Sequence, residues 1–193
     1  MRILLIRHGP SAHSLPAWLP LNRAALERWR NDYDAAGIVE DASAPASVHA
    51  HAARAHIMAA SDLPRAVESA SHLWPGRPVV ISPLFREAPI RIPSLGPVRV
   101  PLPLWALIIH AQWAIDILRG QDMTAESRAR VTEAATWCEQ ACRARSTSAV
   151  VAVVTHGVFR RELARALNAR GWKSGGRRSY APWSVWELVG QSA

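Results

Sequence analysis

Short apolar runs alternate with stretches of helical periodicity along this chain. Residues 2–7 and 149–155 are apolar almost throughout, and such runs indicate strands that are covered on both faces of a sheet. Residues 22–34 instead place large apolar side chains at helical spacing, which predicts a helix. Strands that alternate with helices indicate an α/β fold.

The other elements follow from the same patterns and from the positions of proline and glycine. Further strands are predicted at 56–60, 79–82 and 184–189, and further helices at 64–74, 104–119, 124–145 and 158–168. Loops are predicted at 41–48, 88–103 and 175–178. We therefore expect a three-layer α/β/α sandwich with a mainly parallel central sheet.

The chain has 193 residues, a length that suggests one domain over residues 1–193. Its proline-rich loop and the apolar helix after it, at about 88–119, are expected to form an insertion. The apolar stretch 102–118 contains Pro103, His110, Gln112 and Asp116, so a packed helix is favoured over a membrane span. The first apolar run is too short for a signal peptide, so a cytoplasmic location is expected.

The formal net charge is +8. Such a charge is either a solvated basic surface or a field that attracts anionic ligands. A nucleic-acid partner is not expected, because zinc-finger spacing, a basic coiled coil and an aromatic RNA-binding motif are all absent from the sequence. Cys138 and Cys142 lie four residues apart, without a histidine nearby to complete a metal site. We interpret them as ordinary small residues, weakly indicative of a reducing compartment.

Two of the buried strands end in His-Gly immediately before a helix. The pairs are His8-Gly9 and His156-Gly157. In open α/β sheets, ligands bind beyond the carboxyl ends of the strands. Arg65 occupies a third such place, after the strand that ends near Ser61. One histidine at a strand end needs no function, but this set together predicts a binding site.

The chemistry of this set favours a phosphoryl group over a metal ion. Metal sites usually recruit carboxylates or cysteines, whereas the forked guanidinium of an arginine binds phosphate oxygens in pairs. We therefore expect phosphate binding by Arg7, Arg65 and His156, with Gly9 and Gly157 letting the backbone approach the ligand. A neutral imidazole at His8 could then attack phosphorus.

Four segments, in order, resemble those of the histidine phosphatase superfamily, which includes the cofactor-dependent phosphoglycerate mutases. They are Arg7-His8-Gly9, the segments 61–66 and 84–87, and Thr155-His156-Gly157. The resemblance covers most of the chain and implies one histidine-phosphatase-like domain without a cofactor or metal. It also implies that His8 becomes a phosphohistidine and that Glu87 protonates the leaving group and then activates water. His8, Glu87 and His156 would be the catalytic residues.

The sequence departs from the family pattern at two places. Pro10, Ser11 and Ser14 follow the first motif, and Ala88-Pro89-Ile90 follows the acid segment. Two alternatives for the acid therefore stay open: Glu87 is a surface carboxylate paired with Arg86, or Asp62 is the proton donor.

The predicted function is a phosphomonoesterase, acting on a phosphorylated small molecule, on phosphohistidine or on a phosphoprotein. The alternatives are a phosphoglycerate mutase, although known mutases are usually longer, and a non-catalytic phospholigand-binding protein. The expected partner is the phosphorylated substrate. The oligomeric state is open, and a homodimer is one of the possibilities.

Overall fold

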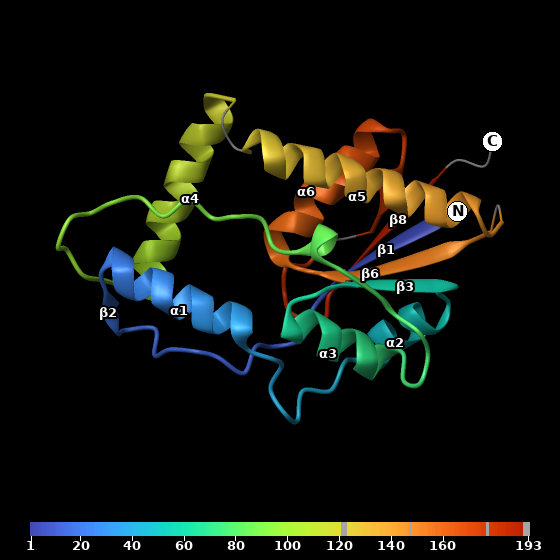
Figure 1. Cartoon of the computed structure of the whole chain (residues 1–193), viewed down its shortest axis with the longest axis horizontal. Coiled ribbons are helices and arrows are strands. Elements are labelled where there is room, and N and C mark those ends of the chain that lie inside the picture. The colour runs from blue at the N-terminus through green and yellow to red at the C-terminus, as the bar shows by residue number, and fades with distance from the viewer. Residues whose placement is uncertain (121–122, 147, 177, 191–193) are drawn as a thin grey trace.

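The computed structural model describes residues 1–120, 123–146, 148–176 and 178–190. A six-stranded sheet runs through its centre in the order β4-β3-β6-β1-β8-β7 (Figure 1). The bounds of these strands are β1 Arg2–Arg7, β3 Ile57–Ser61, β4 Val80–Ser82, β6 Val150–Thr155, β7 Lys173–Gly175 and β8 Val185–Val189. The first four strands in that order are parallel, whereas β8 is antiparallel to both of its neighbours. The sheet is therefore mixed and mostly parallel.

Helices cover both faces of the sheet (Figure 1). The helices α2 (Ala46–Ala53) and α3 (Pro64–Leu73) lie on one face, and α5 (Ala125–Arg143) and α6 (Gly157–Ala169) lie on the other. Side chains of a strand point alternately to the two faces. Accordingly, Ile3 and Leu5 pack in the cluster with α5 and α6, while Leu4 and Ile6 pack in the cluster with α2 and α3. The predicted three-layer α/β fold is confirmed.

A third, smaller apolar cluster lies beside the sheet, at the left of Figure 1. It is built from α1 (Arg23–Ala35), α4 (Leu102–Leu118), and a two-stranded sheet of β2 (Pro20–Leu21) and β5 (Val100–Pro101). Trp105 of α4 is 1% exposed, and its indole N–H donates to the carbonyl of Leu21 at 2.8 Å. This bond helps to fix α4 against β2 and thereby places α4 near the carboxyl ends of β1 and β6.

Several predicted elements need correction. The predicted loop 41–48 gives way at residue 46 to α2, which the pattern missed because only Val48 and Ala52 of this short helix are buried. The predicted loop 88–103 contains β5 and the start of α4, since Pro103 lies in the first turn, where proline is tolerated. A 3-10 helix over Pro83–Phe85 was also missed. Gly175 ends β7 instead of starting the predicted loop 175–178, and residue 177 of that loop lies outside the described residues.

The two cysteines of α5 are buried free thiols. Burial raises the pKa of Cys138 well above its usual value and that of Cys142 to about 11, so both stay protonated at neutral pH. Among the helices of the described residues, none is long and apolar enough to cross a membrane.

Candidate active site

Both His-Gly turns and Arg65 meet at the carboxyl edge of the sheet. His8 directly follows β1, His156 directly follows β6 and is the N-cap of α6, and Arg65 lies in the first turn of α3. The strands are adjacent in register, with β6 between β1 and β3. The two imidazole rings are 5.1 Å apart between centroids. The structure therefore brings together residues that the sequence separates by up to 149 positions, the interval from Arg7 to His156.

The tautomer of His8 follows from its hydrogen bonds. Its Nδ1 lies 2.6 Å from the carbonyl oxygen of Gly9, which can only accept, so Nδ1 carries the proton. Nε2 then carries the lone pair, which accepts a hydrogen bond from Nε of Arg65 at 3.3 Å. Burial, followed by the charges of Arg65, Arg7 and Arg160, lowers the pKa of His8 to about 3, although the bond to Gly9 opposes the shift. His8 is therefore a neutral imidazole that carries its proton on Nδ1 and its lone pair on Nε2.

His156 is fully buried. Burial and the neighbouring His8, Arg65 and Arg7 lower its pKa well below the usual value, so it too is neutral at pH 7. Neither of its ring nitrogens has a hydrogen-bond partner within the part of the chain that the structure describes. A buried polar group without a partner is costly. An oxyanion in this pocket would satisfy the N–H of His156.

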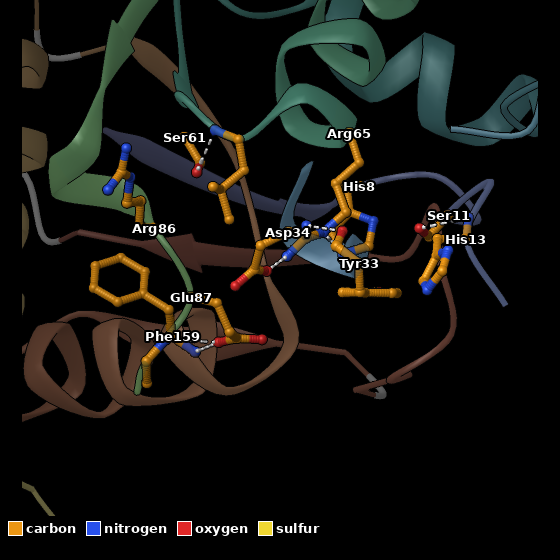
Figure 2. A network of polar contacts seen from close by, with 12 residues as sticks. His8, Ser11, His13, Tyr33, Asp34, Ser61, Arg65, Arg86, Glu87 and Phe159 are labelled. Carbon is orange, nitrogen blue, oxygen red and sulfur yellow. Dashed lines mark hydrogen bonds and ion pairs between the residues drawn. The ribbon is translucent and has the colours of Figure 1, made fainter. Parts of the chain in front are cut away.

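Arg65 is 1% exposed and is held by the end of α1. Nη1 donates to the carbonyl of Tyr33 at 2.8 Å, and Nη2 donates to Oδ1 of Asp34 at 2.9 Å. The guanidinium also lies 4.4 Å from the centroid of the Tyr33 ring. Figure 2 shows this cluster beside His8. A guanidinium has five N–H bonds, so each terminal nitrogen keeps one for a further acceptor.

Arg7 is the last residue of β1 and directly precedes His8. Its Nη1 donates to the carbonyl of Tyr180. Its Nε is buried and lacks a hydrogen-bond partner among the described residues. A Cβ added at Gly157 would lie 3.7 Å from Cζ of Arg7, so the start of α6 packs closely against this guanidinium. Arg7 thus adds a second cation with an unused N–H.

Ser69 is a site residue that the sequence analysis missed. It is fully buried, accepts a bond from the Gly9 N–H at 2.8 Å and donates to the carbonyl of Arg65 at 2.6 Å. It therefore ties the first His-Gly turn to α3. Ser69 lies one helical turn after Arg65, and this i, i+4 spacing was the signal that could have revealed it.

Gly9 is required by packing against Trp183. A Cβ at position 9 would lie 2.5 Å from Cζ2 of the Trp183 ring, which is closer than real atoms approach. The backbone N–H of Trp183 also donates to the carbonyl of His8 at 3.3 Å. The absence of a side chain at Gly9 thus lets the segment before β8 close over His8.

Arg160, which the sequence analysis also missed, fixes that segment. It is fully buried, and it donates to the carbonyls of Ser184 at 3.0 Å and Ser179 at 2.6 Å. Burial lowers its pKa to about 10, so it remains charged at neutral pH. Because Tyr180 lies in this segment, Arg160 also positions the carbonyl that Arg7 contacts. Arg160 follows His156 by one helical turn.

Glu87 is bound by the start of α6. Its Oε1 accepts from the backbone N–H groups of Ala88, Val158 and Phe159, at 2.9, 3.1 and 2.8 Å (Figure 2). Oε2 has one longer bond, from Val158 at 3.3 Å. Negative charge at a helix N-terminus is favourable, which explains why a carboxylate sits there.

The contacts of Arg86 bear on both alternatives for the acid. Arg86 does not pair with Glu87 but forms a two-bond ion pair with Asp62, with both N···O distances at 2.6 Å. The interpretation of Glu87 as a surface partner of Arg86 is therefore wrong. Both carboxylate oxygens of Asp62 accept a hydrogen bond from Arg86.

A cavity of about 500 Å³ opens beside these groups. Arg7, Arg65, Glu87 and Gly157 are among the residues that line it. Aromatic side chains line much of the rest: Trp29, Tyr33, Trp113 and Tyr180. The described residues contain no cluster of three or more His, Cys, Asp or Glu side chains suited to a metal ion. The arrangement offers cationic and N–H donors to an anion, with a carboxylate at the cavity wall.

Comparisons with known proteins agree on the fold. A glucosyl-3-phosphoglycerate phosphatase from mycobacteria, complexed with VO3, superposes with a TM-score of 0.59 and 17% identity over 97% of this chain and 96% of that one. A phosphoserine phosphatase from Entamoeba histolytica gives 0.56 and 14%, over 97% and 90%. An ecdysone phosphate phosphatase from Bombyx mori, complexed with tungstate, gives 0.54 and 11%, over 98% and 92%.

These structural neighbours are members of the histidine phosphatase superfamily, and each aligns with this chain over nearly the full length of both. At such low identity the likeness shows the fold alone. No protein-family model and no curated protein matches the sequence. The resemblance noted from the four sequence motifs is thus confirmed at the level of the fold.

Proposed function

We propose that this protein is a phosphomonoesterase that works through a phosphohistidine on His8. The observation that carries the proposal is the protonation state of His8. A neutral imidazole whose proton is held on Nδ1 by the Gly9 carbonyl carries its lone pair on Nε2, where Nε of Arg65 donates to it. That is the form of histidine that can act as a nucleophile.

In the first step, Nε2 of His8 attacks phosphorus, and the bond from phosphorus to the leaving oxygen breaks. Glu87, which must enter this step in its protonated form, gives its proton to that oxygen and becomes a carboxylate. Arg7, Arg65 and His156 hold the three equatorial oxygens, where charge is spread in the loose transition state. The N–H groups left unused on Arg7, on His156 and on the terminal nitrogens of Arg65 support this role.

In the second step, Glu87 takes a proton from water, and the water oxygen attacks phosphorus. The bond between phosphorus and Nε2 breaks, and inorganic phosphate leaves. The Oε2 oxygen of Glu87, which has only one long backbone bond, is the oxygen we assign to both proton transfers. The expected substrate is a phosphorylated small molecule, as it is for the phosphatases with the same fold.

The test is release of phosphate from 4-nitrophenyl phosphate by the protein and by His8→Asn. We expect kcat/KM to fall by about a thousandfold or more in the variant. His72→Asn is the matched control, because His72 is exposed on α3, and it should keep full activity. Equal phosphate release by the protein and His8→Asn would contradict the proposal, and tight vanadate binding without turnover would favour a non-catalytic phospholigand-binding protein.

A further inference from the structure

A second cavity, of about 350 Å³, lies between α4, α5 and α6 next to the candidate active site. Five residues line both this cavity and the first: Ile90, Ile109, His110, Trp113 and Val158. The two cavities therefore share a wall, made mostly of apolar and aromatic side chains. Each is within the size range of small-molecule sites.

Most of the surface that lines the second cavity is apolar. Pro89, Met123, Val131 and Phe159 line it in addition to the shared wall. Phe159 and Val131 are also part of the main core, at 0% and 6% exposure. Water in such a cavity finds few hydrogen-bond partners, so an apolar ligand gains free energy by entering it.

The acidic side chains at this cavity are already paired. Asp116, which is 5% exposed, accepts a bond from Gln112 at 2.9 Å and lies 3.8 Å from Nη1 of Arg91. Glu162, also 5% exposed, forms an ion pair with Arg161 at 3.1 Å. Each carboxylate therefore already has an arginine within ion-pair distance.

The cation deepest in this lining is engaged as well. Arg130 donates to the backbone carbonyls of Arg86 at 2.6 Å and of Glu87 at 3.2 Å. Burial lowers its pKa, which shows that the apolar surroundings disfavour charge there. The remaining N–H groups of Arg130 could still bind an anion, but a carboxylate or phosphate here would have to give up its water for mostly apolar surroundings.

The chain itself links the two cavities at Glu87. In the proposed reaction the leaving oxygen takes its proton from Glu87, so the leaving group starts on that side of the phosphorus. Ala88, Pro89 and Ile90 follow directly and line the second cavity, and Ile90 faces both. Arg30 donates to the carbonyl of Ile90 at 3.0 Å and so fixes this segment to α1.

We propose that the second cavity binds the leaving group of the substrate, and that this group is an elongated, uncharged apolar chain or ring system. The inference rests on the proposed phosphatase reaction for the direction in which the leaving group points. Small charged phosphoesters would fill only the first cavity and leave the second without a ligand.

The test is the affinity of n-alkylphosphonates from ethyl to octyl, measured by calorimetry. These compounds keep the phosphoryl group but cannot be hydrolysed, so binding is read without turnover. We expect the Kd to fall about three- to fourfold for each methylene that enters the cavity. The Val131→Phe variant, which fills the second cavity but does not line the first, should abolish this dependence and leave the ethyl compound unaffected.

Two further variants keep the result interpretable. Ala129→Phe is the matched control, since Ala129 is exposed on the same helix, and it should retain the full dependence. Val131→Thr keeps the shape of the side chain but replaces a methyl group with a hydroxyl, so it should weaken octyl binding several-fold even if the larger variant does not fold.

The outcomes separate this inference from the proposed function. A Kd that does not change from ethyl to octyl overturns the inference, and so does a dependence that survives in Val131→Phe. Turnover of alkyl phosphates without any chain-length effect leaves the proposed function standing and removes only the second cavity's role. A clear chain-length effect without turnover of any phosphate ester supports the cavity and contradicts the catalytic proposal, whereas no binding of any phosphonate contradicts both.

Discussion

Nε of Arg65 donates a hydrogen bond to Nε2 of His8 at 3.3 Å, so the guanidinium assigned to the phosphate also holds the lone pair assigned to the attack. The other two nitrogens of Arg65 are held by the end of α1, through Tyr33 and Asp34. A phosphoryl group that reaches His8 must therefore draw Arg65 away from this arrangement. Asp34, which holds Arg65, then influences both the binding of the phosphoryl group and the attack by His8.

Replacement of Asp34 by Asn should strengthen binding of inorganic phosphate or vanadate. The carboxylate competes with the anion for Arg65 and repels it, and because Asp34 is partly exposed, its effect is about 1 kcal/mol or less. We expect the Kd for vanadate to fall by roughly two- to fivefold. Asp32→Asn, an exposed change in the same helix, is the control. Weaker binding by Asp34→Asn would mean that the ion pair prepares Arg65 for the anion.

Replacement of Glu87 by Gln should slow turnover in a way that depends on the leaving group. An alkoxide needs a proton as it departs, so kcat/KM for an alkyl phosphate should fall by about a hundredfold or more. A dinitrophenolate leaves without help, so the first step with that ester should change little. The amide oxygen still accepts from the N–H groups of α6, and the melting temperature should stay close to that of the unmodified protein. Equal losses with both esters would remove Glu87 from the role of acid.

The main parts of the site were predictable from the sequence because they depend on local pattern. The buried runs before His8 and His156 identify central parallel strands, whose carboxyl ends must meet at one edge. Pro64 marks the start of the helix that carries Arg65. Each of these signals lies within about ten residues of the side chain that it positions.

The residues that the analysis missed contact the site across long stretches of chain. Asp34 meets Arg65 over 31 positions, and Arg160 meets Ser184 over 24. The local sequence does not distinguish an arginine on the exposed face of an amphipathic helix from one that is buried, as Arg160 is. The short strand β7 was not predicted. The strand β8 was predicted at 184–189 but not as antiparallel, because strand direction is set by tertiary pairing and not by hydrophobic pattern.

Stability should fall in acid because of the buried histidines. The pKa of His8 is about 3 in the folded protein and close to 6.5 when unfolded, so between these values only the unfolded chain takes up the proton. The free energy of unfolding therefore decreases as pH falls below 6.5, and at pH 5 His8 alone contributes a loss of about 2 kcal/mol. This loss should be absent in His8→Gln.

Urea unfolding of the protein and of His8→Gln at pH 7.5, 6 and 5 measures this effect. The difference between the two proteins should shift in favour of the variant as pH falls. A constant difference over this range would show that His8 is protonated as readily in the folded protein as in the unfolded chain.

Replacement of Gly9 by Ala should destabilise the fold. The new Cβ meets the Trp183 ring at 2.5 Å, and overpacking of this kind costs about 1–3 kcal/mol. Gly175→Ala is the matched control, because the nearest atom to its Cβ would be 3.9 Å away. Denaturant unfolding measures both variants. If Gly9→Ala is as stable as Gly175→Ala, the segment around Trp183 does not close on His8 as described.

The most direct test of the account is to trap the phosphorylated enzyme. A ³²P-labelled aryl phosphate is mixed rapidly with Glu87→Gln, in which loss of the base that activates water should make the intermediate accumulate. We expect a label that is stable in alkali, labile in acid and mapped to His8, and that disappears when His8→Asn is added to the same variant. Two results would contradict the assignment of His8 as the nucleophile, provided that the unmodified protein turns the ester over. One is a label on another residue, and the other is no label on the unmodified protein or on Glu87→Gln.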